Sequence, residues 1–273
     1  MVPMEHIAII GAGSIGEALI SGLIASGRDP KTITATNRSS QRSEALEQDY
    51  GVRTTSDNRD ALRHADIAVL CVKPTQVLEV LEELGEVLCA SDVNPVIVSM
   101  AAGVTLAAME DAVSAAGTPI VRVMPNTPML VGKGVLAVAY GRFVEQEQRE
   151  AVTTLLQAGG DVVEVEEKQL DAVTAISGSG PAYFFYVTEA LVDAGVALGL
   201  PRELASRLAT TTAAGAGAML EGNLDPVALR AGVTSPAGTT ARAIREFEES
   251  GVRGAFYRAT AACAERSSQL SHG

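Results

Sequence analysis

The strongest constraint on the fold is the order of two kinds of apolar pattern along the chain. Up to residue 165, short β-rich runs such as HIAII and NPVIVSM alternate with runs of helical periodicity such as SIGEALISGLIASG. Such alternation predicts a mainly parallel sheet that helices cover on both faces. From residue 166 onward the strand patterns stop and helical periodicity dominates. The sequence therefore predicts α/β architecture: an N-terminal Rossmann-type doubly wound parallel sheet, residues 1–165, followed by an all-helical domain, residues 166–273.

Composition and charge narrow the range of partners. The 273 residues carry a formal net charge of −12, which disfavours a nucleic-acid surface or an anionic membrane as partner. The apolar run AYFFYVTEALVDAGVALGL is interrupted by Glu189 and Asp193, and the N-terminus lacks the features of a signal peptide. Cys71, Cys89 and Cys263 are widely spaced, without zinc-like pairing. We therefore expect a cytoplasmic protein with reduced thiols and no bound metal, nucleic acid or membrane.

A glycine-rich turn follows the first strand pattern. The segment GAGSIG fits the pattern G-x-G-x-x-G and opens a helical run. Its glycines allow a tight turn and let the backbone approach a pyrophosphate at the helix N-terminus. A purely structural turn is the alternative, but the position between strand and helix favours a dinucleotide site. The predicted cofactor contacts here are Gly11, Gly13, Ser14, Ile15 and Gly16.

The end of the second strand pattern predicts which coenzyme binds. The segment TATNRSSQR carries no carboxylate where an NAD enzyme usually binds the ribose 2′-hydroxyl. Asn37, Arg38, Ser39 and Arg42 supply donors and positive charge suited to a 2′-phosphate instead. A polar loop without a ligand is the alternative. We expect NADPH as the preferred coenzyme and NADH as a weaker one.

Two proline-containing loops, CVKPTQ and VMPNTP, follow later strand patterns. In an open α/β sheet the carboxyl ends of the strands border the ligand crevice. We therefore expect Lys73, Pro74, Asn126 and Thr127 at that crevice, with simple turn prolines as the alternative.

Two stretches rich in glycine and hydroxyl groups precede helical runs in the second half of the chain. They are SGSGPAY, residues 177–183, and VTSPAGTT, residues 233–240. Free amides at such helix starts can hold a carboxylate without an arginine, whereas a helix cap or a hinge is the alternative. The second helix is expected to begin near Thr240, and the residues that lead into it are Thr234, Ser235, Gly238 and Thr239.

The helical half is poor in side chains that move protons. After Lys168 there is no lysine, and no histidine until His272. A hydroxyacid dehydrogenase normally needs Lys or His to move the hydroxyl proton. Hydride addition to a protonated imine is less demanding, because its carbon is already electrophilic. A hydroxyl donor such as Thr240 could be enough for that reaction.

The motifs together resemble the pyrroline-5-carboxylate reductase family. The resemblance runs from GAGSIG through CVKP, AAGVT, MPNTP and SGSGPAY to VTSPAGTT and the FE of ARAIREFE, and covers nearly the whole chain. It implies NADPH-dependent reduction of L-1-pyrroline-5-carboxylate, a cyclic imino acid, to L-proline by hydride transfer to the imine carbon. The family usually has Gly-Gly where this chain has Ala237-Gly238, a change that could tighten the pocket slightly.

The resemblance also implies site residues that the patterns alone do not. On its own, Glu166 would be interpreted as a helix N-terminal charge. The implied cofactor contacts are Asn58 near the adenosine phosphate, and Val72, Lys73, Ala101 and Ala102. The implied substrate contacts are Glu166, Ser235, Gly238, Thr239 and Thr240, with Thr240 as the catalytic proton donor.

The resemblance further implies a homodimer formed by the helical domain, with the active site at the dimer interface and dimers often assembled into a decamer. The Ala-rich run TTTAAGAGAML agrees with close helix–helix approach. Three rival interpretations remain: a hydroxyacid dehydrogenase, which the missing Lys and His disfavour, another imine reductase, and a catalytically silent NADP(H)-binding sensor or scaffold.

Overall fold

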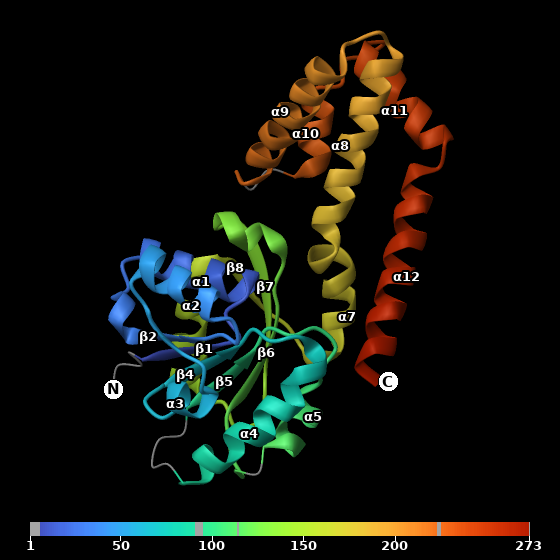
Figure 1. Ribbon diagram of the computed structural model, residues 1–273. Helices are drawn as coiled ribbons and strands as arrows, with labels where there is room; N and C mark the ends of the chain where they lie inside the picture. The colour runs from blue at the N-terminus through green and yellow to red at the C-terminus, as the bar shows by residue number, and fades with distance from the viewer. Residues whose placement is uncertain (1–5, 91–94, 114, 223–224, 273) are drawn as a thin grey trace. The chain divides into compact units, whose positions relative to one another are not determined.

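The chain forms two compact units (Figure 1). The structure, a computed structural model, describes residues 6–90, 95–113, 115–222 and 225–272. The first unit comprises residues 1–178 together with 264–273, and the second comprises residues 179–263.

The first unit is built on one eight-stranded sheet with the strand order β3-β2-β1-β4-β5-β6-β7-β8. All neighbouring strands pair in parallel except β6 and β7, which are antiparallel. The order 3-2-1-4-5-6 is that of a doubly wound dinucleotide-binding sheet, so the expected Rossmann-type fold is confirmed. The strands are β1 Ile7–Ile10, β2 Ile33–Thr36, β3 Arg53–Thr55, β4 Ile67–Leu70, β5 Val96–Ser99, β6 Ile120–Met124, β7 Gly134–Tyr140 and β8 Gly160–Glu164.

Helices cover both faces of this sheet, because successive strand residues point to opposite sides. Ile7 and Ile9 of β1 face a core that also contains residues of α1, α2 and α6, whereas Ala8 and Ile10 face a core that contains residues of α3, α4 and α5. Figure 1 shows α1 and α2 on one side of the sheet and α4 and α5 on the other. These helices are α1 Ser14–Ala25, α2 Ser40–Tyr50, α3 Asn58–Leu62, α4 Val77–Ala90, α5 Leu106–Ala112 and α6 Gln146–Leu156.

A continuous helical segment follows the sheet. It runs from α7 Leu170–Val173 through a π-helical turn, Thr174–Gly178, into α8 Gly180–Ala197. Ser179 between them also has helical dihedral angles, φ −89° and ψ −15°. SGSGPAY thus leads into α8 with Pro181 in the first turn, as expected, but the residues before α8 are already helical, which the sequence did not predict. Pro181 is tolerated there because it occupies the first turn of α8.

The second unit consists of helices with a very small core of its own. Its buried cluster is Val192, Ala205 and Ala209, with Leu200 packed against it. Many large apolar side chains are exposed instead, among them Phe184, Phe185, Tyr186, Leu198 and Tyr257. Apolar surface of this extent marks an interaction face. Besides α8, the helices here are α9 Arg202–Leu220, α10 Pro226–Gly232, α11 Thr239–Glu249 and α12 Val252–His272, the last of which extends into the first unit.

The two compact units do not divide the chain at residue 165. Residues 166–178 and the last turns of α12 belong to the unit that contains the sheet. Within it, Ser267 Oγ donates to Asp171 Oδ1 at 2.6 Å. The functional division into 1–165 and 166–273 stays a prediction, because contacts within one chain do not say what a second subunit covers. No described helix is long and apolar enough to cross a bilayer.

Candidate functional site

The glycine turn after β1 has the backbone that a dinucleotide site requires. Gly11 has a φ of +78°, and a Cβ there would lie 2.5 Å from Val72 Cγ1, so a larger residue would clash. Gly13 caps α1 without a side-chain hydrogen bond. In the described part of the chain, no acceptor is recorded for the backbone N–H groups of Ser14, Ile15 and Gly16. Unpaired amides at a helix N-terminus favour an anion such as a pyrophosphate.

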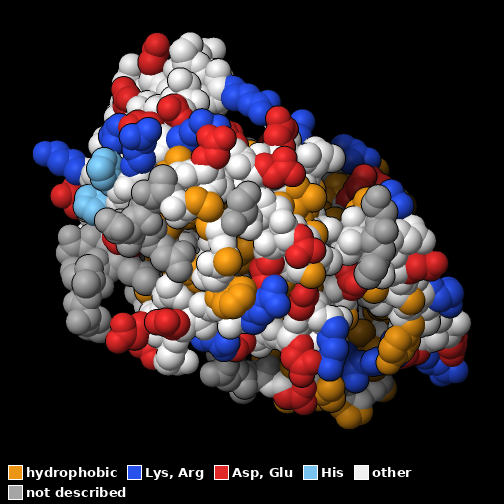
Figure 2. Space-filling view, turned by 90° about the horizontal axis from the view of Figure 1, so that it is seen from below, with side chains coloured by type: hydrophobic (Ala, Val, Ile, Leu, Met, Phe, Trp, Pro, Cys, Tyr) orange, Lys and Arg blue, Asp and Glu red, His pale blue; other side chains and the backbone are white. Residues whose placement is uncertain are grey.

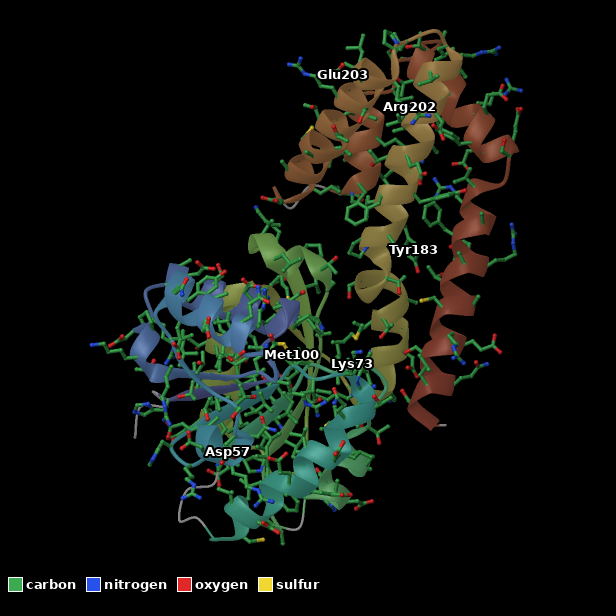
Figure 3. The ribbon with its side chains drawn as sticks, in the orientation of Figure 1. Asp57, Lys73, Met100, Tyr183, Arg202 and Glu203 are labelled. Atoms are coloured by element: carbon green, nitrogen blue, oxygen red, sulfur yellow. The ribbon has the colours of Figure 1, made fainter. Side chains whose placement is uncertain are left out.

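A cavity of about 520 Å³ opens beside this turn, at the carboxyl ends of β1, β2 and β4. Ligands of open α/β sheets bind at this edge, and the volume is typical of a cofactor site. Figure 3 labels Lys73 at this edge, beyond the end of β4. Seven residues predicted to contact the cofactor line it: Gly11, Gly13, Asn37, Arg38, Asn58, Val72 and Lys73. Residues not predicted from the sequence also line it: Thr36, Ser56, Cys71, Gln76, Val80 and Glu83.

A chain of hydrogen bonds fixes Asn58 in the wall of this cavity. The buried hydroxyl of Thr36 accepts from Gly11 N at 3.0 Å and donates to Asn58 Oδ1 at 2.8 Å. Asn58 Nδ2 donates to Glu83 Oε2 at 3.2 Å. Because an amide carries two N–H groups, one N–H of Asn58 remains for a ligand.

Some polar side chains near the end of β2 bond within the fold, whereas others face the cofactor cavity. Asn37 Nδ2 donates to a carbonyl of the glycine turn at 2.9 Å, and Ser39 caps α2 by accepting from Arg42 N at 3.4 Å. The guanidinium of Arg42 pairs with the Glu17 carboxylate of α1. Arg42 is thus occupied, which leaves Arg38 as the cation of this loop that lines the cavity.

The remaining cofactor residues lie outside that cavity. Gly16 is buried against β1, where a Cβ would approach Ile9 Cγ2 to 3.0 Å. Ala101 is buried in the core and Ala102 is exposed. Ser14 and Ile15 line a second hollow of about 150 Å³ instead, together with Asn126, Thr127 and Gly178.

Glu166 and its neighbour Glu167 have different surroundings. Glu166 is exposed, pairs with Lys168, and forms a capping box with Gln169. Glu167 instead accepts from Arg122 Nη1 at 2.9 Å and from the backbone N–H of Leu106 at 2.7 Å. Sequence reasoning missed this second pair. A charged residue within the apolar strand IVRVM was the available signal, because a buried Arg needs a partner.

The loop 233–240 lies in the second unit and turns sharply before α11. Gly238 N donates to Ser235 O at 3.0 Å, and Ala237 between them has a φ of +60°. Proline at the second position and a positive φ at the third are features of a type II turn. Ala237 is the one non-glycine residue with a positive φ in the described ranges.

Several polar groups of this loop are available to a ligand, although the Thr234 hydroxyl donates to Arg230 O at 2.6 Å. Gly238 caps α11 without any side-chain hydrogen bond. Among described residues, no partner is recorded for the hydroxyls of Ser235, Thr239 and Thr240, nor for the backbone N–H groups of residues 239–241. The alternative that these hydroxyls cap the helix is therefore not supported by the geometry.

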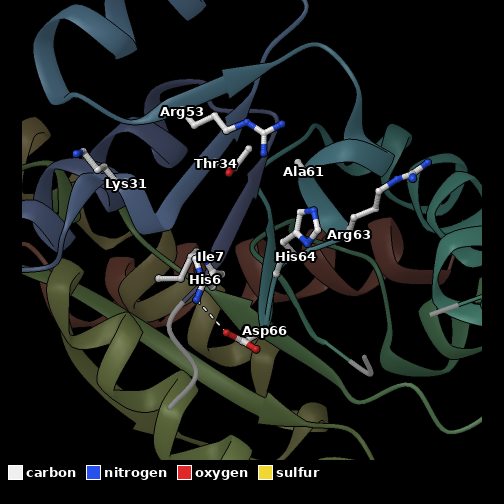
Figure 4. A pocket seen from close by; sticks show the side chains of 10 residues that line it. His6, Ile7, Lys31, Thr34, Arg53, Ala61, Arg63, His64 and Asp66 are labelled. Atoms are coloured by element: carbon white, nitrogen blue, oxygen red, sulfur yellow. Dashed lines mark hydrogen bonds between the residues drawn. The ribbon is translucent and has the colours of Figure 1, made fainter. Parts of the chain in front are cut away.

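Further titratable groups of interest lie in the first unit. Burial raises the pKa of the Cys71 thiol, in the wall of the cofactor cavity, to about 12. His6 and His64 line a separate cavity of about 430 Å³ with Lys31, Arg53 and Asp66 (Figure 4). In Figure 2, His side chains, drawn in pale blue, lie beside Lys and Arg side chains on the surface. That cavity lies at the amino ends of β1, β2 and β4, opposite the edge where such sheets bind ligands.

Comparison with known proteins agrees with this geometry over nearly the full chain. Residues 167–270 match the family described as pyrroline-5-carboxylate reductase dimerisation, and residues 6–103 match the family described as NADP oxidoreductase coenzyme F420-dependent. A pyrroline-5-carboxylate reductase of Corynebacterium melassecola is 56% identical over 98% of this chain and 99% of its own. The solved structure of a pyrroline-5-carboxylate reductase from Coxiella burnetii has a TM-score of 0.93 and 39% identity, covering 98% of this chain and 99% of that one.

A further solved structure connects the family with the cofactor. The Plasmodium falciparum pyrroline carboxylate reductase, described with NADP bound, has a TM-score of 0.83 and 30% identity, covering 98% of this chain and 99% of that one. The similarity extends over nearly the full length of both chains, and it agrees with a glycine turn beside a nucleotide-sized cavity. The chain therefore belongs to the pyrroline-5-carboxylate reductase family, whose members are NAD(P)-dependent oxidoreductases.

Proposed function

We propose that this chain reduces L-1-pyrroline-5-carboxylate to L-proline, the last step of proline biosynthesis, with NADPH as the reductant. The observation that carries the proposal is the loop 233–240, in which the hydroxyls of Ser235, Thr239 and Thr240 and the amides at the start of α11 have no recorded partner among the described residues. A loop of this kind suits a small carboxylate with a polar nitrogen. It lacks the Lys or His that reduction of a ketone normally requires.

The residues of the first unit fit a dinucleotide with a 2′-phosphate. The free amides at the start of α1 would hold the pyrophosphate, and Arg38 would pair with the 2′-phosphate. Asn58 and Lys73 line the same cavity. NADPH, when bound, supplies the hydride that the imine carbon accepts. NADH lacks the phosphate that Arg38 would bind, so it serves as the weaker coenzyme.

The residues of the second unit would bind the substrate and deliver a proton. The amides at the start of α11 and the Ser235 hydroxyl would hold the carboxylate, since an anion is favoured at a helix N-terminus. If the imine nitrogen is not yet protonated, Thr240 would donate its hydroxyl proton to that nitrogen as the carbon accepts hydride and regain a proton from water, so that the C=N double bond becomes a single C–N bond. Glu166 is proposed as a further contact near that nitrogen.

Self-association is part of the proposal. The family model that matches residues 167–270 is a dimerisation domain, and the second unit has a very small core. We propose a homodimer, with dimers assembled into a decamer, in the cytoplasm, where the three free thiols stay reduced. Light scattering at low concentration gives the molar mass. A fully active monomer would contradict the dimer, and an active dimer that does not associate further would contradict the decamer.

The test of function is a reaction with the purified chain. NADPH and pyrroline-5-carboxylate are mixed with the protein, the loss of the reduced nicotinamide absorbance is followed, and proline is measured in the product. We expect one proline per NADPH consumed. Binding of NADPH without turnover would identify a sensor or scaffold, and faster reduction of unrelated cyclic imines would identify a different imine reductase.

A further inference from the structure

Arg38 has a partner that comes from a different strand. Arg38 follows β2, whereas Gln76 ends a short 3₁₀ turn, Pro74–Gln76, after β4, and both side chains line the cofactor cavity. With its amide oxygen turned toward Arg38, Gln76 accepts from Nη2 at 2.9 Å and from Nη1 at 3.0 Å. That orientation is required chemically, because a guanidinium has N–H donors and no acceptor.

This contact leaves the binding edge of Arg38 open. The two N–H groups that converge on one oxygen lie at the end of the guanidinium fork, between Nη1 and Nη2. The side edge, formed by Nε–H and one Nη N–H, remains available for two parallel bonds to a phosphate. Because Gln76 is neutral, Arg38 also keeps its net positive charge toward a ligand. Arg42, in the first turn of α2, is different, since the carboxylate of Glu17 compensates its charge.

An arginine held in this way loses less side-chain freedom when it binds a phosphate. A free arginine has many rotamers, and ordering it on binding weakens affinity. We propose that Gln76 is a specificity-determining positioning residue, which holds Arg38 ready for the 2′-phosphate of the coenzyme and so favours NADPH over NADH. This inference rests on the proposed coenzyme role of Arg38.

The test measures binding of two nucleotides that differ by the 2′-phosphate alone, adenosine 2′,5′-bisphosphate and adenosine 5′-monophosphate, by calorimetry at one ionic strength. Gln76→Met removes the acceptor at similar size and should weaken the bisphosphate about three- to tenfold. Gln76→Glu places a negative charge beside the phosphate and should weaken it more than about tenfold. The monophosphate should bind each variant as it binds the wild type, which also shows that the variants are folded. Thr75→Ala, an exposed neighbour on the same turn, is the matched control and should change neither affinity.

A double mutant separates positioning from a direct contact. If Gln76 acts through Arg38, Gln76→Met should have no further effect on the bisphosphate in an Arg38→Ala background. In steady-state assays, Gln76→Met should raise the KM for NADPH and leave the KM for NADH and kcat unchanged. An unchanged preference for the bisphosphate in Gln76→Met, while Arg38→Ala abolishes it, overturns the role of Gln76 alone. An unchanged preference in Arg38→Ala as well overturns the coenzyme assignment of Arg38 and the inference with it.

Discussion

The backbone at Ala237 offers a test in which two opposing effects can be weighed. Ala237 is exposed and has a φ of +60°, in the left-handed region. That conformation costs an L-residue about 1–2 kcal/mol relative to glycine. Replacing Ala by Gly releases this strain, but it also gives the unfolded chain more freedom, which costs about 0.4–1 kcal/mol. Because the methyl group is exposed, little packing is lost, so the strain term should prevail.

We therefore expect Ala237→Gly to raise the free energy of unfolding by about 0.5–1 kcal/mol. For a chain of this size that corresponds to a rise in Tm of roughly 1–4 °C. Thermal melts and urea titrations at one protomer concentration measure it, since dimer stability depends on concentration. Ala243→Gly is the matched control, because Ala243 is an exposed residue within α11. There the same chemical change should lower stability by about 0.5–1 kcal/mol.

The reasoning depends on the opposite signs of these two changes. If both substitutions lower the Tm by similar amounts, Ala237 is not strained and the turn argument is refuted. Ala237→Val adds a β-branched side chain at positive φ and should lower stability, which provides a second check on the same dihedral angle.

Four further perturbations follow from the geometry. Thr240→Ala should lower kcat roughly 10- to 10³-fold with NADPH affinity nearly unchanged, whereas Ser235→Ala should raise the KM for the imine more than it lowers kcat; steady-state kinetics with wild-type kcat in Thr240→Ala would refute the proton role. Glu167→Ala leaves the buried Arg122 without its carboxylate and should lower the free energy of unfolding by about 2–4 kcal/mol. The loss is smaller than for a fully buried pair because Glu167 is 32% exposed. A loss below about 1 kcal/mol in urea titrations would show that this pair behaves as an ordinary surface ion pair. Burial raises the pKa of the Cys71 thiol to about 12, so the unfolded chain deprotonates first and stability should fall as the pH rises from about 9 toward 12; urea titrations of the wild type and Cys71→Ala with equal slopes against pH would contradict this.

The longer elements of the sheet were predictable because local pattern and global fold agree. Apolar strand runs such as HIAII and IVRVM end at glycine or proline, and the longer helices carry a full amphipathic period. Shorter elements were missed. Strand β3 and helix α3 are three and five residues long, too short to show a period, although Asp57 accepts from the N–H groups of Arg59 and Asp60 as a helix cap. The antiparallel direction of β7 was also not predicted, because strand pattern does not encode direction.

Those parts of the candidate site were predictable in which one short segment supplies both the backbone conformation and the side chains that bind the ligand. The glycine turn and Arg38 are of this kind, and both border the cofactor cavity. Gln76, Glu83 and Thr36 were not found, because they come from a turn, a helix and a strand end that meet only in the folded unit. In SGSGPAY the helix start with Pro181 in its first turn was predictable, whereas the preceding π-helical turn was not, because small residues before a helix do not reveal whether the chain is already helical.

The last turns of α12 have a consequence for synthesis of the chain. Residues 264–273 belong to the unit that contains the sheet, where Gly103 lies against Leu270 and Ser267 binds Asp171. The ribosome must therefore translate all of residues 179–263 before the first unit of the nascent chain can be completed. At about 5–20 residues per second, that interval is on the order of ten seconds. During this interval the sheet has formed on the ribosome without the contacts that residues 264–273 supply. A chain truncated shortly before Ser267 would therefore leave Gly103 without its contact to Leu270, although all strands of the sheet are present.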